Sequence, residues 1–337
     1  MGKIHKRRNK KITENTEIPA SFWERLGQIV GPTHLDAVKA TFNQKPSTFR
    51  VNTIKANKED VVQELQDLGF KMQEVSWCPG SYILENKTKR ELIDLPMYAE
   101  GKIYMQSLAS MVPPLMLGPH PGEMVLDLTA APGSKTSQMA AMMNDQGTLI
   151  ANDNSKIRFF KLKHNMELLG VVDETKPEWN FTLRQEDGCD LCGDFLDTFD
   201  KILVDAPCSA EARFLMDDPK TFSYWSEKKV KEMAMKQRKL LFSAWYALKP
   251  GGTLVYSTCT FSPEENEVQI SRLLNRFPGE AQIEDISHTL AGLKHLPGLT
   301  SWKERTFHPE ITKALRIFPT PQVEGFFVAK IKKLQKD

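Results

Sequence analysis

The sequence predicts an α/β protein with a parallel sheet and crossover helices, preceded by a smaller α/β module. From Glu123 onward, short apolar segments alternate with amphipathic helices or loops, which is typical of a parallel sheet. Residues 49–86 show a strand, helix and strand pattern on a smaller scale. The 337 residues, 40% of them apolar, can fill the cores of one large domain and a smaller one.

The N-terminal elements follow from hydrophobic spacing. Apolar residues at helical spacing predict two short helices within 18–45, and "FRVNTIK" predicts a strand. The segment 57–69 predicts a helix with Asn57 as its N-cap, and "GSYILEN" predicts a returning strand. We therefore expect a basic flexible arm at 1–17, a helical and α/β module at 18–100, and a larger domain at 101–337.

Composition restricts the setting of the protein. The chain has no apolar run long enough to span a membrane and no secretory signal, which predicts a cytoplasmic location. Five cysteines, an odd number without regular spacing, indicate free thiols rather than a disulfide framework. The net charge is only +2, yet six Lys or Arg fall within the first eleven residues. This arm could gather phosphates or be a solvated tail.

The larger domain contains five predicted parallel strands. They cover residues 124–128, 147–153, 181–187, 200–207 and 251–258. Ligands of such sheets bind outside the carboxyl ends of the strands, so residues that follow each strand are the candidates for a site.

The loop after the first strand reads "DLTAAPGSKTSQ". Small residues Ala130, Ala131 and Gly133 allow close approach of a ligand, Pro132 stiffens the turn, and the next helix offers free N–H groups. The spacing matches neither a P-loop nor the three-glycine dinucleotide motif. A ligand that carries a carboxylate rather than a pyrophosphate fits this loop.

Two acidic residues follow the next two strands. Asp153 lies twenty residues after Gly133, a separation typical of a carboxylate that binds ribose, and Asp187 is placed to meet an adenine edge. Each acid alone is more often a helix cap or a solvated loop residue. Together with the loop, they favour a cofactor that contains adenosine.

Two cysteines and one acid follow the last two strands. Asp205 and Cys208 end the fourth strand and Cys259 ends the fifth, so both thiols are expected on the cofactor side of neighbouring strands. Ser262 and Glu265 form a predicted capping box of a following helix, with Pro263 at its first position. Free N–H groups at that helix start would favour a thiolate at Cys259.

A thiolate beside a carboxylate and an adenosine cofactor is suited to attack on an electron-poor pyrimidine. Addition of sulfur to carbon 6 makes carbon 5 nucleophilic, and that carbon can capture a sulfonium methyl group. Asp205 can hydrogen-bond the ring as charge develops, and the second thiol can assist release.

These motifs resemble a known family. "DLTAAPGSK", "VDAPCS", "YSTCTFSPEENE", "RIFPTPQVEGFFVAKIKK", "FRVNTIK" and "GKIYMQSLASMVPP" are similar to those of the Nop/Sun (NSUN-type) RNA cytosine-5 methyltransferases, and most similar to the bacterial RsmF-type 16S ribosomal RNA enzymes. The resemblance covers about residues 20–333.

The resemblance implies a Rossmann-like class I S-adenosylmethionine methyltransferase domain behind a helical and RRM-like module that helps to hold RNA. It implies that Cys259 is the nucleophile, that Cys208 assists product release and that Asp205 lies against the base and the methyl donor. The implied cofactor contacts are Thr129, Ala130, Ala131, Pro132, Gly133, Ser134, Lys135, Asp153, Arg158, Asp187 and Asp205. No metal site is implied.

The chain departs from the family pattern at two places. The family continues "PCS" with glycine, whereas this chain has Ala210, which would be strained if that position requires a positive φ. RsmF-type proteins also carry a further C-terminal RNA-binding region, whereas this sequence stops soon after "FFVAKIKK".

Other residues carry weaker signals. Cys189 and Cys192 form a lone C-x-x-C without the second pair expected of a zinc site. Arg50 is a candidate for a phosphate or base contact, and Trp225 could stack on a base or fill a core. The Lys and Arg residues of 228–239 could meet RNA, although a solvated helix face explains them better.

The sequence thus predicts a monomeric cytoplasmic methyltransferase that acts at carbon 5 of cytosine in RNA, with ribosomal RNA favoured over transfer RNA. Two alternatives remain open: a DNA cytosine methyltransferase with Cys208 as nucleophile, and a catalytically idle RNA-binding factor for ribosome assembly.

Overall fold

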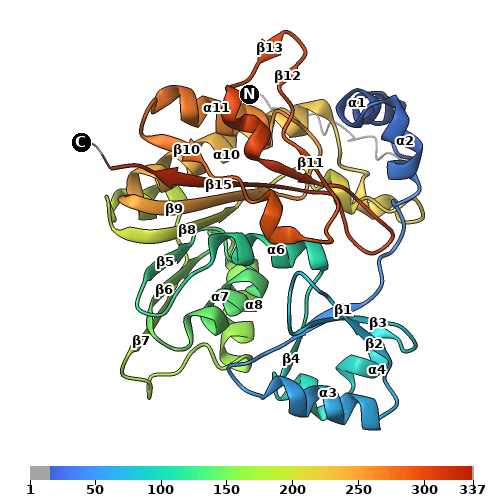
Figure 1. The fold of residues 1–337 in the computed structure, drawn as a ribbon, viewed down its shortest axis with the longest axis vertical. Coiled ribbons are helices and arrows are strands. Elements are labelled where there is room, and N and C mark those ends of the chain that lie inside the picture. The colour runs from blue at the N-terminus through green and yellow to red at the C-terminus, as the bar shows by residue number, and fades with distance from the viewer. Residues whose placement is uncertain (1–15, 336–337) are drawn as a thin grey trace, which may run out of the picture.

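The computed structural model describes residues 16–335, so the expected basic arm at 1–17 lies almost entirely outside the described residues. A large mixed sheet forms the centre of the molecule, and a small four-stranded sheet lies at one end of it (Figure 1). A two-stranded hairpin, β12 (Ser301–Trp302) with β13 (Arg305–Thr306), projects from the other end (Figure 1).

The large sheet contains the five predicted strands. Its main path, in spatial order, is β11 (His295–Pro297), β14 (Leu315–Ile317), β15 (Phe326–Lys333), β9 (Leu248–Thr258), β8 (Phe199–Asp205), β5 (Met124–Asp127), β6 (Gly147–Asn152) and β7 (Trp179–Arg184), with β10 (Ala281–Ile283) paired to β15. The strands β7, β6, β5, β8 and β9 are parallel, as predicted. The C-terminal strands are antiparallel.

The order of the parallel strands reverses between β5 and β8, because β6 and β7 lie on one side of β5 and β8 and β9 on the other. Ligands of doubly wound sheets bind at such a reversal. This is the Rossmann-like arrangement that the sequence predicts, with its site expected at the carboxyl ends of β5 and β8.

Helices cover both faces of the sheet. One face packs against α9 (Gly188–Gly193), α10 (Glu227–Ala247) and α11 (Glu267–Arg276), and the other against α6 (Leu108–Leu117), α7 (Ser134–Met143) and α8 (Lys156–Leu168). Alternate residues of a strand therefore enter different cores: Val204 of β8 packs with the first set of helices and Leu203 with the second. Four 3₁₀ turns complete the large domain: η1 (Glu211–Arg213), η2 (Pro219–Thr221), η3 (Ser287–Leu290) and η4 (Pro309–Lys313).

The small sheet has the strand order β2-β3-β1-β4, with every pair antiparallel. Its elements are β1 (Thr48–Val51), α3 (Lys58–Asp67), β2 (Met72–Glu74), β3 (Ser81–Leu84), α4 (Lys89–Ile93), α5 (Pro96–Ala99) and β4 (Ile103–Met105). The predicted N-cap is present, because the side chain of Asn57 accepts hydrogen bonds from Glu59 and Asp60. Strand β4 extends this sheet beyond residue 100.

Both faces of the small sheet are covered at its centre. All residues of β1 and β3 are buried. Phe49 and Tyr82 pack into the core of the small module, whereas Ile83 packs into the core that contains α6 and α7. The central strands therefore offer no open face on which RNA bases could stack.

The two helices of the predicted 18–100 module lie elsewhere. Helices α1 (Ala20–Val30) and α2 (Pro32–Lys39) pack against the large domain, far from the small sheet (Figure 1). Phe22 contacts Phe42, Phe214 and Trp225 through ring centroids 5.1–5.9 Å apart. These aromatic contacts draw the N-terminal helices to the large domain.

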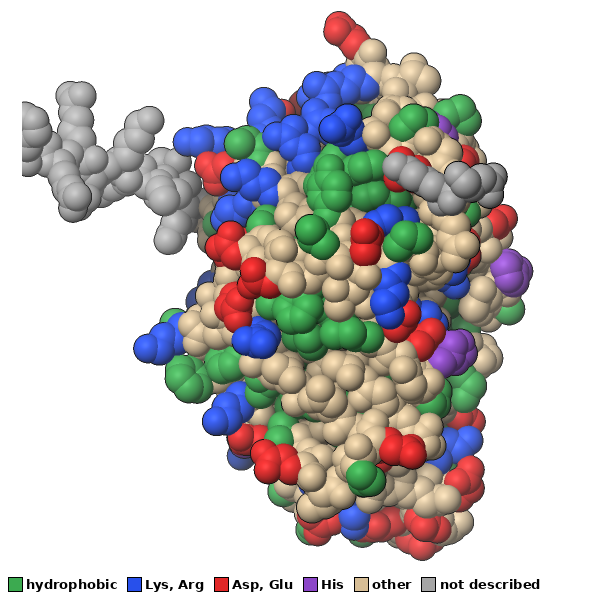
Figure 2. All heavy atoms as spheres, turned by 90° about the vertical axis from the view of Figure 1, so that its left-hand side faces the viewer, with side chains coloured by type: hydrophobic (Ala, Val, Ile, Leu, Met, Phe, Trp, Pro, Cys, Tyr) green, Lys and Arg blue, Asp and Glu red, His purple; other side chains and the backbone are tan. Residues whose placement is uncertain are grey.

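Charge is unevenly distributed over the surface. Figure 2 shows Lys and Arg side chains gathered on the upper part of one face and more Asp and Glu toward its lower end. No helix within residues 16–335 combines the length and apolar character needed to cross a membrane.

Candidate active site

A cavity of about 810 Å³ opens at the carboxyl edge of the parallel strands. Its size suits a small-molecule ligand. The predicted site residues on its wall are Thr129, Ala130, Ala131, Pro132, Ser134, Lys135, Asp153, Arg158, Asp187, Asp205, Cys208 and Cys259. The topology thus brings residues from five strand ends to one place.

Gly133 is not part of the cavity wall. It has φ 105°, and a β carbon there would lie 2.5 Å from Cε of Met166 and 3.1 Å from Cδ1 of Leu162. Both neighbours belong to α8. Close packing of the loop on α8, rather than contact with a ligand, explains the glycine.

The two thiols meet at the ends of neighbouring strands. In the parallel pairing of β8 with β9, Asp205 lies opposite Ser257, which places the following loops side by side. The Sγ atoms of Cys208 and Cys259 are 3.4 Å apart. Both side chains are half-buried and line the cavity.

The thiol pair is electrostatically asymmetric. The hydrogen bond from Cys208 lowers the pKa of Cys259, and nearby Arg213 and Lys135 act in the same direction against burial. The same hydrogen bond, together with burial, raises the pKa of Cys208 well above its usual range. Cys259 therefore ionises more easily, whereas Cys208 stays protonated and can donate a hydrogen bond to it.

Asp205 is held by two partners at the cavity wall. One carboxylate oxygen lies 2.7 Å from Nζ of Lys135, and the other accepts a hydrogen bond of 2.8 Å from Ser257 Oγ. Lys135 also donates to Ser110 Oγ at 2.8 Å. The loop after β5 is thereby tied to the strand end that carries the thiols.

Asp153 and Arg158 brace the loop after β5. The Asp153 carboxylate is buried, lies 3.3 Å from the Arg158 guanidinium and accepts from the backbone N–H of Ala131 at 3.3 Å. Arg158 also donates to the carbonyl oxygen of Ala131. Both residues line the cavity, and the contacts just described hold them to each other and to the backbone of Ala131.

Two further carboxylates differ in their exposure to the cavity. Asp187 accepts from the N–H of Cys189 at 2.9 Å, so it caps α9 as well as lining the wall. Asp127 is buried; its Oδ2 accepts from Thr136, whereas its Oδ1 has no hydrogen-bond partner among residues 16–335. Burial raises the pKa of Asp127 to about 7.

The turn after Cys208 confirms the concern raised by the family departure. Ala210 has φ 56° and ψ 32°, a left-handed conformation that glycine adopts without strain and alanine does not. The chain keeps this turn because Ala210 precedes η1, which returns the chain toward the Cys259 loop: the N–H of Ala212 donates to the carbonyl of Cys259 at 3.2 Å.

The predicted capping box is wrong. Helix α11 begins at Glu267, with Asn266 as a cap that makes no side-chain hydrogen bond. The Glu265 side chain instead forms hydrogen bonds with Ser209 and Gln237, because it is buried between the two cysteine loops. The helix start is thus too far along the chain to stabilise a thiolate at Cys259, whose lowered pKa comes from Cys208, Arg213 and Lys135.

Burial decides the interpretation of Arg50 and Trp225: the contact considered for Arg50 is wrong, and the alternative of Trp225 as a core residue is confirmed. Arg50 is buried, donates to Gln106 at 2.9 Å and to Ser137, and lies over the ring of Tyr104. Burial lowers its pKa to about 10. Trp225 is buried and donates to Glu211 at 2.8 Å, so it fills the core.

Arg213, Lys236 and Lys239 line the cavity without having been predicted as site residues. The signal for Arg213 was its position five residues after Cys208, on a turn that must return to the site. Lys236 and Lys239 lie on α10 one turn apart, and their spacing places them on one face.

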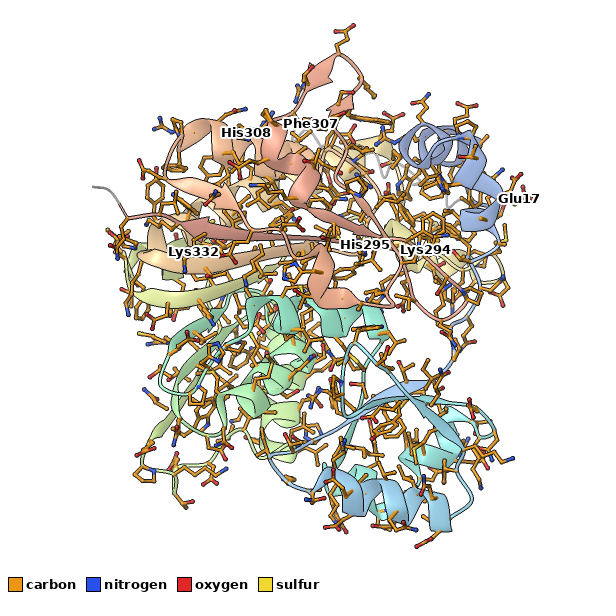
Figure 3. All side chains as sticks on the ribbon, in the orientation of Figure 1. Glu17, Lys294, His295, Phe307, His308 and Lys332 are labelled. Atoms are coloured by element: carbon orange, nitrogen blue, oxygen red, sulfur yellow. The ribbon has the colours of Figure 1, made fainter. Side chains whose placement is uncertain are left out.

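The histidines and cysteines that the structure describes are spread over several elements. No group of three or more His, Cys, Asp or Glu within residues 16–335 is arranged to hold a metal ion. His295 lies on β11 and His308 precedes η4, on separate elements (Figure 3). Cys189 lines the cavity, whereas burial raises the pKa of Cys192 to about 12.

Comparison with known proteins agrees with this geometry. Residues 114–332 match the family model described as 16S rRNA methyltransferase RsmB/F. The chain belongs to this family. Residues 18–108 also match the model for the N-terminal domain of 16S rRNA methyltransferase RsmF. The resemblance predicted from the sequence is confirmed.

Relatives extend the match over most of this RsmB/F family chain. Ribosomal RNA small subunit methyltransferase F of Vibrio atlanticus is 36% identical over 327 residues, which cover 95% of this chain and 65% of the relative. The protein of that name from Pectobacterium atrosepticum is 33% identical, with 94% and 63% covered. The chain therefore spans somewhat less than two thirds of the length of these relatives.

Solved structures share the fold. The methyltransferase homolog protein from Pyrococcus horikoshii is 31% identical, with a TM-score of 0.75 over 94% of this chain and 100% of that one. NSun6 from Pyrococcus horikoshii has a TM-score of 0.76 over 94% of this chain and 99% of that one, and at 23% identity it supports the fold alone.

Proposed function

We propose that this chain transfers a methyl group from S-adenosylmethionine to carbon 5 of cytosine in 16S ribosomal RNA. The observation that carries the proposal is the thiol pair: Cys208 and Cys259 lie 3.4 Å apart, with pKa shifts of opposite sign, beside an ion-paired Asp205. Membership of the RsmB/F family supports the reaction and the RNA.

The cavity fits the proposed cofactor in size and donor set. An adenosine ribose can bind near Asp153 and an adenine edge near Asp187, and both carboxylates lie on the wall. The unpartnered Oδ1 of Asp127 is an acceptor that suits the ammonium group of a bound amino acid. The residues of 129–135 other than Gly133, together with Arg158, would complete the holding residues. When bound, the cofactor supplies an electrophilic methyl group on a sulfonium.

The thiols have separate roles in the proposed reaction. The Cys259 thiolate adds to carbon 6 of the cytosine, which places the displaced electron pair at carbon 5. Asp205 hydrogen-bonds the ring edge as charge develops there. After methylation a base removes the proton of carbon 5, the bond between sulfur and carbon 6 breaks, and Cys259 leaves as a thiolate. Cys208 stays protonated because its pKa is raised, so its S–H can donate a hydrogen bond to that thiolate and stabilise it as a leaving group.

The RNA approaches over a basic rim. Arg213, Lys236 and Lys239 line the cavity, and Glu324 interacts electrostatically with Arg213. The target base must leave its stack to reach Cys259, and cations beside the cavity can hold the flanking phosphates. This use concerns Lys236 and Lys239, whereas the other cations of 228–239 keep the interpretation as a solvated face.

The domain division is part of the proposal. We assign residues 101–337 to the methyltransferase domain and residues 18–100, with β4, to the N-terminal region, in agreement with the extents of the two family models. Because the centre of the small sheet is covered, RNA would contact the edges and loops of the module rather than the sheet face. The proposal also includes that the protein is a monomer and acts in the cytoplasm, where ribosomes are made.

Transfer of labelled methyl groups tests the function. Purified protein with methyl-labelled S-adenosylmethionine should label 16S rRNA or the small subunit, and bisulfite sequencing should locate the label at a cytosine. In RNA from cells that lack the gene, that cytosine should no longer be protected from deamination by bisulfite. Label on transfer RNA or DNA would select those alternatives, and no label on any of them would support an idle assembly factor.

A further inference from the structure

Two buried glutamates lie between the loops that carry the site cysteines. Glu211 follows Cys208 by three residues and Glu265 follows Cys259 by six. Glu211 is 1% exposed and Glu265 is fully buried. Buried carboxylates are costly unless they are neutral or saturated with hydrogen bonds, so their partners decide their charge.

Two hydroxyl groups join these carboxyl groups. Oε1 of Glu265 lies 2.5 Å from Oγ of Ser209, which lies 2.8 Å from Oγ1 of Thr260, which lies 2.7 Å from Oε2 of Glu211. Each of the three oxygen contacts requires one proton between its two oxygens. The hydroxyl groups supply two protons, so a third must come from a carboxyl group.

The hydrogen-bond partners show which carboxyl group carries the third proton. Glu211 is surrounded by donors: its carboxylate accepts from Trp225 Nε1, Ser262 Oγ, Thr260 Oγ1 and the N–H groups of Phe261 and Ser262. A proton on Glu211 would compete with these donors. Glu265 accepts from Ser209 N–H and Gln237 at Oε2 alone, at 2.9 and 2.8 Å. Its Oε1 faces the Ser209 hydroxyl, as expected of the O–H of a neutral carboxyl group.

We propose that Glu265 and Glu211 share one proton, which is held on Glu265 at neutral pH. The hydrogen-bonded series from Glu265 through Ser209 and Thr260 to Glu211 then positions Cys208 beside Cys259. Ser209 is covalently next to Cys208 and Thr260 next to Cys259, so the hydrogen bond between their hydroxyls ties the two loops directly. Glu265 and Glu211 are positioning residues, since neither lines the cavity. The consequence for methyl transfer rests on the proposed function, whereas the shared proton does not.

The electrostatic surroundings are consistent with this arrangement. Burial, with the charge of Glu211 as the next cause, raises the pKa of Glu265 to about 8. Arg25 of α1 approaches from the far side, donating to Ser262 Oγ at 3.2 Å while it pairs with Glu264. Tyr256 of β9 donates to the backbone carbonyl of Glu265 rather than to its carboxyl group. The Cys208 thiol interacts electrostatically with Glu265, and Tyr224 interacts with Glu211.

Two isosteric variants separate the proposal from a general structural role. In Glu265→Gln, the amide nitrogen can donate to Ser209 Oγ and the amide oxygen can accept the two N–H donors, so the side chain copies a neutral Glu265. In Glu211→Gln, the amide nitrogen must face groups that are already donors. The first variant is expected to keep the thiols together and the second to separate them.

A trivalent arsenical reports thiol separation without RNA or cofactor. Phenylarsine oxide binds two adjacent thiols: two As–S bonds form, the As=O bond breaks, and that oxygen leaves with the two thiol protons as water. The measurement uses the full chain with Cys189→Ser, which removes the other C-x-x-C pair, and Cys259→Ser as the control that abolishes binding. We expect Glu265→Gln to bind within about threefold of its parent and Glu211→Gln at least about tenfold more weakly.

Infrared spectroscopy tests the proton itself. The parent protein at pH 7 should show a neutral carboxyl C=O band that disappears in Glu265→Gln. Equal arsenical affinities in the two glutamine variants, or weaker binding only in Glu265→Gln, would overturn the proposal, as would an unchanged carboxyl band. If Glu211→Gln does not fold, Thr260→Val takes its place, because it removes the hydroxyl group that links Ser209 to Glu211. Loss of methyl transfer with normal arsenical binding would instead count against the proposed function.

Discussion

The Sγ atoms of Cys208 and Cys259 lie 3.4 Å apart although 51 residues separate them in the chain. The pairing of β8 with β9 brings them to the same edge, and a hydrogen bond joins the adjacent residues Ser209 and Thr260. The pKa of Cys208 is raised and that of Cys259 is lowered, which gives the pair two distinguishable reactivities.

Cys259 should be alkylated faster than Cys208 at pH 7. Iodoacetamide reacts with thiolates, and only Cys259 has a lowered pKa, so we expect at least about a fivefold difference in rate. Peptide mass spectrometry after brief treatment measures both rates. Arg213→Ala should slow the reaction of Cys259, whereas Arg184→Ala, which removes a cation at the end of β7, should not. Equal rates at the two cysteines would contradict the assigned asymmetry.

Lys135→Ala should destabilise the protein more than removal of a surface lysine. Lys135 is buried and pairs with Asp205 at 2.7 Å, so its loss leaves a poorly compensated carboxylate and should cost about 1–3 kcal/mol of unfolding free energy. The control is Lys249→Ala, whose half-exposed pair with Asp200 at 3.0 Å should contribute less than about 1 kcal/mol. Urea unfolding measures both, and similar losses would show that the Lys135 pair is not special.

Ala210→Gly should stabilise the protein. The substitution relieves the left-handed strain at φ 56°, about 1–2 kcal/mol, against the larger entropy that glycine gives the unfolded chain, about 0.5–1 kcal/mol. A net gain of roughly 0.5–1 kcal/mol is expected in thermal or urea unfolding. Ala212→Gly, in the following 3₁₀ turn, has no such strain to relieve and should destabilise. A loss of stability in Ala210→Gly would mean that the turn is not strained.

Stability should fall as pH rises because of Glu265. Its pKa in the folded state is raised to about 8 from an ordinary value of 4.5, so the folded state holds a proton that the unfolded chain releases. The contribution is complete below about pH 4.5 and is lost progressively up to about pH 8. The difference in unfolding free energy between the parent and Glu265→Gln should follow this curve. A flat difference across that range would show that Glu265 is ionised in the folded protein.

Removal of the rim cations should weaken RNA binding in a salt-dependent manner. Lys236→Ala and Lys239→Ala should each lower the slope of log K against log salt concentration by about 0.7, the value for one phosphate contact on a single strand. Lys303→Ala, on the hairpin of β12 and β13, is the control. Slopes that match the parent in both rim variants would show that RNA does not cross this rim.

The sequence predicted the elements that local patterns determine. The parallel strands, α3 with its Asn57 cap, and the meeting of Cys208 with Cys259 follow from periodicity and from the rule that sites lie at carboxyl strand ends. The strain at Ala210 was also predicted, because a single turn decides it.

Contacts between segments far apart in the chain could not be predicted from local sequence patterns. Glu265 matched a capping box locally, yet a tertiary contact with Ser209, 56 residues away, decided its role. Arg50 looked like a surface cation, but packing of the small sheet on α7 buried it against Ser137. The antiparallel strands β10, β14 and β15 were missed because the crossover pattern of the preceding strands does not extend to them.

Capture of the covalent intermediate is the most direct test of whether Cys259 is the nucleophile. RNA that contains 5-fluorocytidine at the target position blocks removal of the carbon 5 substituent, so the proposed adduct should accumulate, and peptide mass spectrometry should locate it. We expect the nucleotide to be covalently bound to Cys259. The adduct should be retained in Cys208→Ala and absent in Cys259→Ala. An adduct on Cys208, or one that survives in Cys259→Ala, would contradict it.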